Sequence, residues 1–276
     1  MSINISKVKA VFFVLACVLS LMMFQGAAHA NLGITPTIIS FADGERYKDI
    51  TLINTSEETK TFQMSWRFFE MQETGASYEP VEKSLSEFDV SKHVFFTPRR
   101  VTIPAKGSQK IRMAFRRPAE VPEGDFHAHL LFSPADNPQI DDEKTQDQSA
   151  AAGVSVKVGY SVPVIVRTGD FQEGGKIGQI QIARSEKGAL TVNVPISRVE
   201  GQHGLVGHLN VYHVPASGAE KLVGEVSNAN IFPEVAQRLI PVTLQEEVSG
   251  GSLKLVLKSG TKDDETVFDE QTFPLN

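Results

Sequence analysis

A long run of alternating apolar residues places the strongest constraint on how this chain can fold. In the segment "VSVKVGYSVPVIVR", Val154 to Arg167, every second residue from Val154 to Val166 is apolar. Side chains alternate across a β-strand, so these seven apolar side chains would all point to one face. At ~3.3 Å per residue the run would be about 40 Å long, whereas a typical strand has about 5–6 residues. The segment therefore predicts an unusually long strand whose apolar face must be covered.

Strand-like alternation extends over the rest of the chain. Segments such as "ITPTIISF" and "KDITLINTS" alternate, and short sequences rich in Gly, Pro, Asn and Ser separate them. No window shows a clear 3.6-residue period, so little helix is expected. Short strands at about ten-residue spacing predict an all-β fold built from immunoglobulin-like sandwiches.

Two interruptions indicate how the chain divides. Residues 135–153, "ADNPQIDDEKTQDQSAAAG", are polar and acidic and predict a long mobile loop. The Gly-containing segment from Thr168 to Gly178 predicts a hinge. We therefore expect a first immunoglobulin-like domain over residues 31–168, which ends in the strand 154–167, and a second β-sandwich domain over residues 169–276.

The first thirty residues have the features of a secretory signal peptide. Lys7 and Lys9 precede the apolar run "AVFFVLACVLSLMMF", and Ala28 and Ala30 form a small-x-small cleavage pattern. We expect residues 1–30 to be removed, leaving a soluble exported protein without membrane insertion; an uncleaved anchor is the alternative. The single cysteine, Cys17, lies in this segment, so the mature chain would have no disulfide.

Charge and motifs argue against several functional classes. The net charge of -6 becomes -8 without residues 1–30, because Lys7 and Lys9 are their only charged residues, and an acidic chain is a poor match for nucleic acid. The sequence contains no nucleotide-binding or nucleophile-elbow motif. Asp141 and Asp142 lie in the predicted loop, where nothing buries them. We therefore expect no enzymatic activity and no cofactor.

One histidine pair has a spacing that suits a metal ion. His127 and His129 would lie on the same face of one strand. No cysteine or third ligand lies near them in the sequence. We therefore expect no metal site and interpret both histidines as solvent-facing strand residues.

The order of these segments resembles a periplasmic chaperone of the chaperone–usher pathway, which assembles pili or fimbriae. The segments "ADGERYKDITLINTS", "FFTPRRVTIPAKGSQKIRM", "EGDFHAHLLF" and "VGYSVPVIVR" match that family's successive turns and strands, over about Ile34 to Arg167. The resemblance implies two immunoglobulin-like domains in an L-shaped arrangement and a location in the Gram-negative periplasm. It also implies pilin subunits and an outer-membrane usher as partners.

The resemblance supplies an explanation for the long apolar face. In such chaperones the strand after the mobile loop is lent to a pilin, an immunoglobulin-like domain that lacks its last strand. This donor-strand complementation implies that the subunit receives Val154, Val156, Val158 and Tyr160. The alternative is that all seven alternating residues face the chain's own core. An exposed apolar strand also favours self-capping by further copies of the chain.

The chain departs from the family pattern where the pilin's terminal carboxylate is anchored. The family's two basic anchor positions correspond to Ile38 or Ile39 and to Pro163 here. None of these is basic, which resembles the archaic branch of the family. Guanidinium groups suit a carboxylate because they can donate two hydrogen bonds to it. The candidate anchors are then Arg99, Arg100 and Arg112.

Two other functions stay open at the level of the sequence. A structural or adhesive surface protein built from the same sandwiches would self-associate or lie at the cell surface. A carbohydrate-binding or glycan-processing protein would need aromatic platforms, and Trp66 is the only tryptophan.

Overall fold

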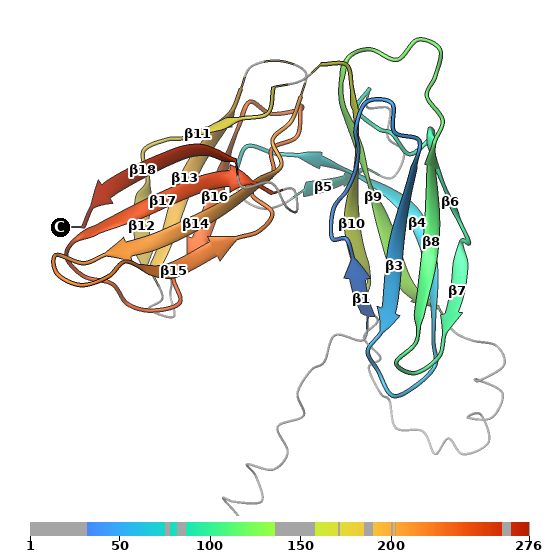
Figure 1. Ribbon diagram of the computed structural model, residues 1–276, viewed down its shortest axis with the longest axis horizontal. Coiled ribbons are helices and arrows are strands. Elements are labelled where there is room, and N and C mark those ends of the chain that lie inside the picture. The colour runs from blue at the N-terminus through green and yellow to red at the C-terminus, as the bar shows by residue number, and fades with distance from the viewer. Residues whose placement is uncertain are drawn as a thin grey trace, which may run out of the picture.

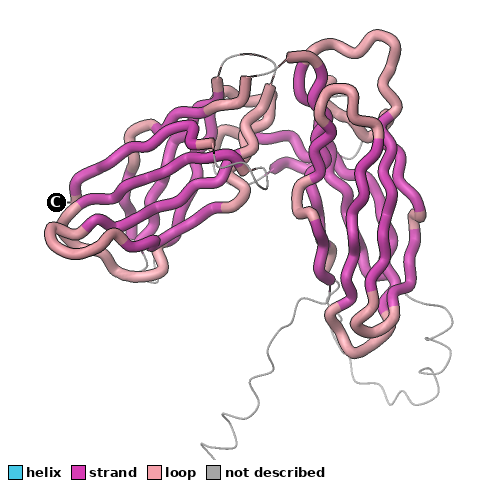
Figure 2. The backbone as a smooth tube through the Cα atoms, in the orientation of Figure 1, coloured by secondary structure: helices cyan, strands magenta, loops and turns pink. Residues whose placement is uncertain are grey.

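Strands make up the regular structure of the chain. The computed structural model describes residues 32–74, 78–81, 87–135, 158–170, 172–184, 190–199, 201, 203–260 and 266–275. These residues form strands β1 to β18 and no helix (Figures 1 and 2). The described residues therefore include no apolar helix of membrane-spanning length. The expected all-β fold is confirmed.

Strands β1 to β10 form two sheets, which pack face to face as the first sandwich. One sheet has the order β1-β3-β8-β6 and the other the order β2-β10-β9-β4-β5, with β7 also pairing with β4. The bounds are β1 Leu32–Thr35, β2 Ile39–Phe41, β3 Tyr47–Asn54, β4 Lys60–Met71, β5 Tyr78–Val81, β6 Val94–Thr97, β7 Arg100–Ile103, β8 Ser108–Phe115, β9 Gly124–Ala135 and β10 Tyr160–Thr168.

Strands β11 to β18 form the second sandwich. Its sheets have the orders β11-β13-β12, with β16 also pairing with β13, and β15-β14-β17-β18. The two sandwiches meet at one end and diverge from there, which gives the L-shaped arrangement (Figure 1). The bounds are β11 Gly175–Ile177, β12 Gln181–Arg184, β13 Leu190–Arg198, β14 Gly207–Val214, β15 Lys221–Val226, β16 Gln237–Thr243, β17 Ser252–Ser259 and β18 Val267–Pro274.

Sequence alternation accounts for the core of each sandwich. On β8, Ile111 and Met113 are fully buried, whereas Lys110 and Arg112 are exposed. On β17, Leu255 is one of three leucines at alternate positions that are fully buried in the second core. Burial of these faces provides the main stabilisation of a chain whose described part contains no cysteine.

The segment "ITPTIISF", expected to be one strand, crosses between the two sheets of the first sandwich. β1 pairs with β3 in one sheet, and β2 pairs in parallel with β10 in the other. Pro36 lies between them after a cis peptide bond, and proline has no backbone N–H to donate to a ladder. Because the chain changes sheets here, β2 has only three residues and covers only part of β10.

Candidate functional site

Half of β10 lies at the edge of its sheet. β10 pairs with β9 along its whole length, from Tyr160 to Thr168. On its other side, β2 covers only Val164 to Val166. Among the residues that the structure describes, no strand pairs with the outer side of Tyr160 to Pro163. We call these four residues the open edge.

The position of Pro163 indicates which backbone groups this open edge presents. A proline inside a paired strand turns its nitrogen away from the partner strand, because it has no N–H to donate. Successive residues alternate in the direction of their backbone groups. Ser161, two residues before Pro163, therefore also directs its N–H and C=O away from β9. Ser161 thus offers one donor and one acceptor to an incoming strand.

The long alternating face divides at Tyr160. Val162, Val164 and Val166 are buried in the core of the first sandwich. Tyr160 is partly buried and packs against the same core. The chain's own core therefore covers Val162, Val164 and Val166.

The other half of the face begins before β10. Val158 is 58% exposed. Val154 and Val156 lie outside the described residues. Their role as lent side chains, together with that of Val158 and Tyr160, remains a prediction.

The expectation that His127 and His129 face solvent is wrong. His127 is fully buried and His129 is 6% exposed, because the second sandwich packs over this part of the sheet. The His127 ring stacks on that of Phe232 with 4.0 Å between centroids, and its Nε2 is hydrogen-bonded to Oε1 of Glu234. Within the described residues, no group of three metal-ligating side chains includes them.

A buried group of charges joins the two sandwiches. The Arg167 Nη2 donates to Oε1 of Glu173 at 2.9 Å, and its Nε lies 3.4 Å from Oδ2 of Asp125. Asp125 is also bound from the second sandwich, by the ring of His203 at 2.8 Å and by the backbone N–H of Gly204 at 2.9 Å. Arg167 and Asp125 are 5% and 2% exposed. Charges this deeply buried require such partners.

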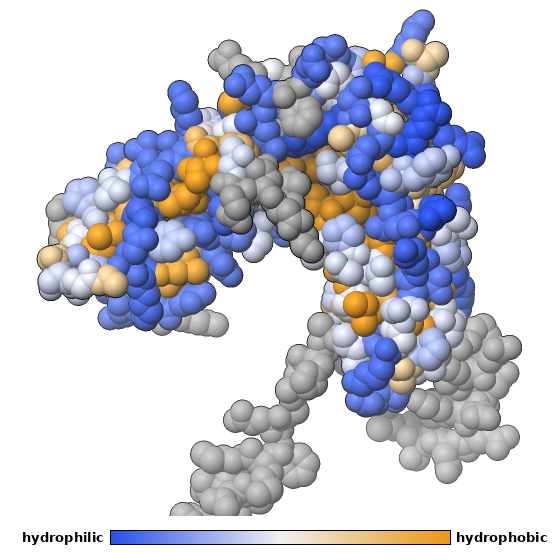
Figure 3. All heavy atoms as spheres, in the orientation of Figure 1, coloured by the Kyte–Doolittle hydropathy of each residue, from blue (hydrophilic) through white to orange (hydrophobic). Residues whose placement is uncertain are grey.

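Apolar contacts close the same junction. Met71 and Ile165 belong to the first sandwich but pack in the core cluster of the second. The Phe232 N–H donates to the sulfur of Met71, and hydrophobic residues gather where the sandwiches meet (Figure 3). Within the segment from Thr168 to Gly178, predicted as a hinge, Glu173 binds Arg167 and accepts a hydrogen bond from the Val206 N–H.

A cavity of about 550 Å³ lies between the sandwiches, directly beside the open edge. Ser161 and Pro163 of β10 line one side, and Arg238 of β16 lines the other. Arg238 is 6% exposed, and its Nη1 donates to the backbone oxygen of Asn230 at 2.8 Å. The remaining lining residues are Phe69, His129, Val226, Asn228, Asn230, Ile240 and Pro241. The cavity thus combines apolar walls with a cation and polar side chains, as ligand sites do.

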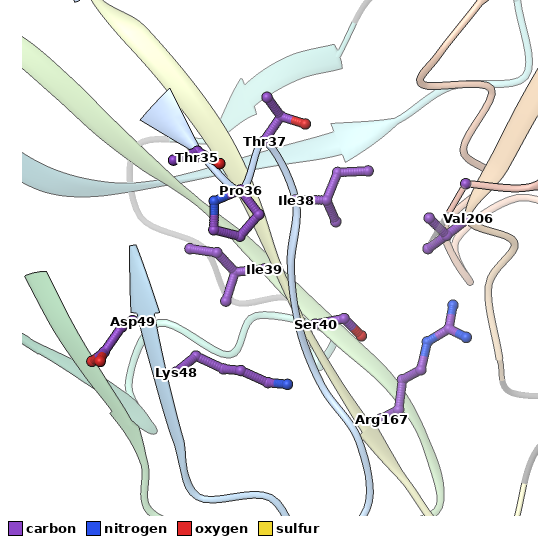
Figure 4. Close-up of a pocket in the computed structure, with 11 residues that line it drawn as sticks. Thr35, Pro36, Thr37, Ile38, Ile39, Ser40, Lys48, Asp49, Arg167 and Val206 are labelled. Atoms are coloured by element: carbon purple, nitrogen blue, oxygen red, sulfur yellow. The ribbon is translucent and has the colours of Figure 1, made fainter. Parts of the chain in front are cut away.

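A second cavity, of about 460 Å³, lies beside the sheet-crossing segment between β1 and β2. Ile38 and Ile39 line it together with Lys48 and Arg167. Figure 4 shows Arg167 reaching from β10 toward Val206. Both cations already have partners: Lys48 pairs with Glu45, and Arg167 belongs to the buried charge group.

The three arginines predicted as anchors lie away from the open edge. Arg112 is on the outer face of the other sheet, where it binds Asp49 and lowers the pKa of that carboxyl through the hydrogen bond and its charge. Arg99 and Arg100 lie at the start of β7, which is separated from β10 by β4 and β9. Sequence reasoning missed Arg238. The sequence did contain an indication: Arg238 alternates with Ile240 and Val242 on β16, so all three side chains point to the same buried face.

No family model and no curated protein matches the sequence. Among solved structures, a chain in the complex of the Salmonella enterica SafA pilin with the SafB chaperone is 9% identical, with a TM-score of 0.47; the match covers 91% of this chain and 99% of that chain. The YadV chaperone is 12% identical, with a TM-score of 0.45 and coverage of 89% and 100%. A chain in the CsuC–CsuE chaperone–tip adhesion subunit complex of Acinetobacter baumannii is 12% identical, with a TM-score of 0.44 and coverage of 89% and 98%. Because these TM-scores lie below 0.5, we argue the function from the geometry of this chain.

Proposed function

We propose that this chain is a non-enzymatic periplasmic chaperone, which captures pilin subunits by strand donation and delivers them to an outer-membrane usher. The observation that carries the proposal is the open edge of β10, which begins two residues after the exposed Val158. A subunit that lacks one strand has unpaired backbone groups and an apolar groove. The open edge would pair with the backbone groups, and Val154, Val156 and Val158 would enter the groove, with Tyr160 at its border.

The energy of this contact suits temporary holding. Each valine buried in the groove would contribute ~1.5–3 kcal/mol, so three would contribute on the order of 5–9 kcal/mol. Ordering the lent segment would offset several kcal/mol of this gain. With the affinity that remains, a competing strand from the next subunit can displace the lent strand without ATP.

Periplasmic co-expression with candidate pilin subunits tests the proposal. A pull-down of the tagged chain should recover a soluble complex with one subunit per chain. Self-association, or a cell-surface location with no bound subunit, would instead favour the structural or adhesive alternative.

The anchor of the subunit's terminal carboxylate is a separate part of the proposal. Arg99, Arg100 and Arg112 remain the candidates from the sequence, and we add Arg238. A strand paired with the open edge would reach the cavity that Ser161, Pro163 and Arg238 line. In this partly enclosed site a charge-assisted hydrogen bond would be stronger than one at the exposed Arg112.

We expect Arg238→Gln to weaken subunit capture by roughly 10- to 100-fold, the value of one or two charge-assisted hydrogen bonds. The dissociation constant of the purified complex is the measurement. The matched control is Arg112→Gln, which removes a cation from the exposed sheet face. If Arg112→Gln weakens capture and Arg238→Gln does not, the anchor lies on the outer sheet and not in the cavity.

A further inference from the structure

His129 occupies the wall of the junction between the two sandwiches. It projects from β9, and its ring centroid lies 5.0 Å from that of Phe69 on β4 and 6.2 Å from that of Phe232 in the second sandwich. The side chain is 6% exposed. Since Phe232 also stacks on His127, separation of the sandwiches would uncover both histidines.

The charged and titratable groups around His129 come from four elements. On β9 itself, the ring of His127 lies 6.2 Å away, with Asp125 further along the same face. On β4, Arg67 is the cross-strand partner of His129, and partners of this kind project from the same face of a sheet. From the second sandwich, Arg238 of β16 lines the same cavity, and Glu234, in the loop before β16, binds His127. A charge on His129 would thus be added at a cavity that the cation of Arg238 also lines.

We propose that His129 makes the junction between the sandwiches acid-sensitive: it stays neutral while the junction is closed and takes up a proton when the junction opens. Acidification therefore shifts the junction toward its open form. The inference goes beyond the proposed function, because it concerns contacts within this chain and requires no partner.

The direction of the shift follows from the two states of the histidine. Burial, and to a smaller extent the charge of His127, lowers the pKa of His129 from the ordinary 6.5 to about 3. Between these two pH values the open form binds one more proton than the closed form. The ratio of the closed form to the open form is therefore highest above pH 6.5. Below pH 6.5 this ratio falls by up to about tenfold for each pH unit.

Amide hydrogen exchange measured at pH 6.5 and pH 5.0, and corrected for intrinsic exchange rates, tests the proposal on the full chain. The reporters are three amides that donate across the junction: Gly204 to Asp125, Phe232 to Met71, and Leu239 to Glu73. We expect their protection to fall by up to about 16-fold at pH 5.0. Amides within the sheet cores, such as those of β8 and β17, should remain equally protected from exchange at both pH values.

The variants separate His129 from other titrating groups. His129→Gln should abolish the pH dependence of the three reporters, whereas His93→Gln, which replaces an exposed histidine, should leave it intact. Unchanged protection at pH 5.0 in the unmodified chain, or the same loss of protection in His129→Gln, would overturn the proposal. If His129→Gln does not fold, an NMR titration of the His129 ring in the unmodified chain decides. A midpoint far below 6.5 supports the proposal, and a midpoint near 6.5 overturns it.

Discussion

We expect Val158→Asp to reduce subunit capture by more than a hundredfold and to leave the fold intact. The valine is 58% exposed in the free chain, so an aspartate there remains solvated and changes stability by no more than ~0.5 kcal/mol. In the complex, the same carboxylate would be forced into the apolar groove of the subunit. Burying an unpaired charge costs several kcal/mol, enough to cancel the contribution of the valines. Pull-down and titration of the purified subunit measure the loss.

Val267→Asp is the matched control for this variant. Val267 is 53% exposed on β18 of the second sandwich, so the chemical change and the exposure are almost the same. This control should capture subunits as the unmodified chain does. Equal capture by Val158→Asp and the unmodified chain would mean that Val158 does not enter the subunit.

Arg167→Ala gives the largest loss of stability that we expect from a single substitution. The substitution removes the cation that lies between Asp125 and Glu173, so both carboxylates of the junction lose their arginine partner. Removing one partner from a buried ion pair costs roughly 3–5 kcal/mol, since the other partner keeps its desolvation penalty. Thermal unfolding should shift down by roughly 10 °C or more.

Arg112→Ala serves as the comparison for Arg167→Ala. Arg112 also pairs with an aspartate, Asp49, but its side chain is 67% exposed and water solvates both partners. Exposed pairs of this kind contribute little to stability. Equal shifts in melting temperature for the two variants would show that the buried charge group does not hold the junction together.

The sequence predicted the sandwiches because their cores depend on local alternation. On β8 and β17 the buried residues are the apolar residues of the alternating pattern. The crossing of "ITPTIISF" between sheets was missed, because alternation continues on both sides of Pro36 and does not identify the partner strand. The same limit applies to the long apolar face that ends at Val166. Alternation predicts that its residues share one side of the strand, but it does not identify which of them the chain's own core covers.

The junction could not be predicted, because it is formed by residues far apart in the sequence. His127 and His129 lie on a polar face that would be solvated if the first sandwich stood alone. Phe232 and Glu234, about one hundred positions later, cover that face. The local indication that another surface packs there was a charged residue two positions from an isoleucine on the same strand face. Arg167 is placed in this way relative to Ile165, and Arg238 relative to Ile240.

The exchange rate of the Ser161 amide tests the central claim most directly. In the free chain this N–H faces outward from the open edge and has no strand to pair with among the described residues, so its hydrogen should exchange quickly. When a subunit is bound, we expect that hydrogen to become protected, while the amide of Val162, which faces β9, is protected in both states. Rapid exchange at Ser161 in a chain saturated with subunit would contradict the claim that β10 supplies the strand.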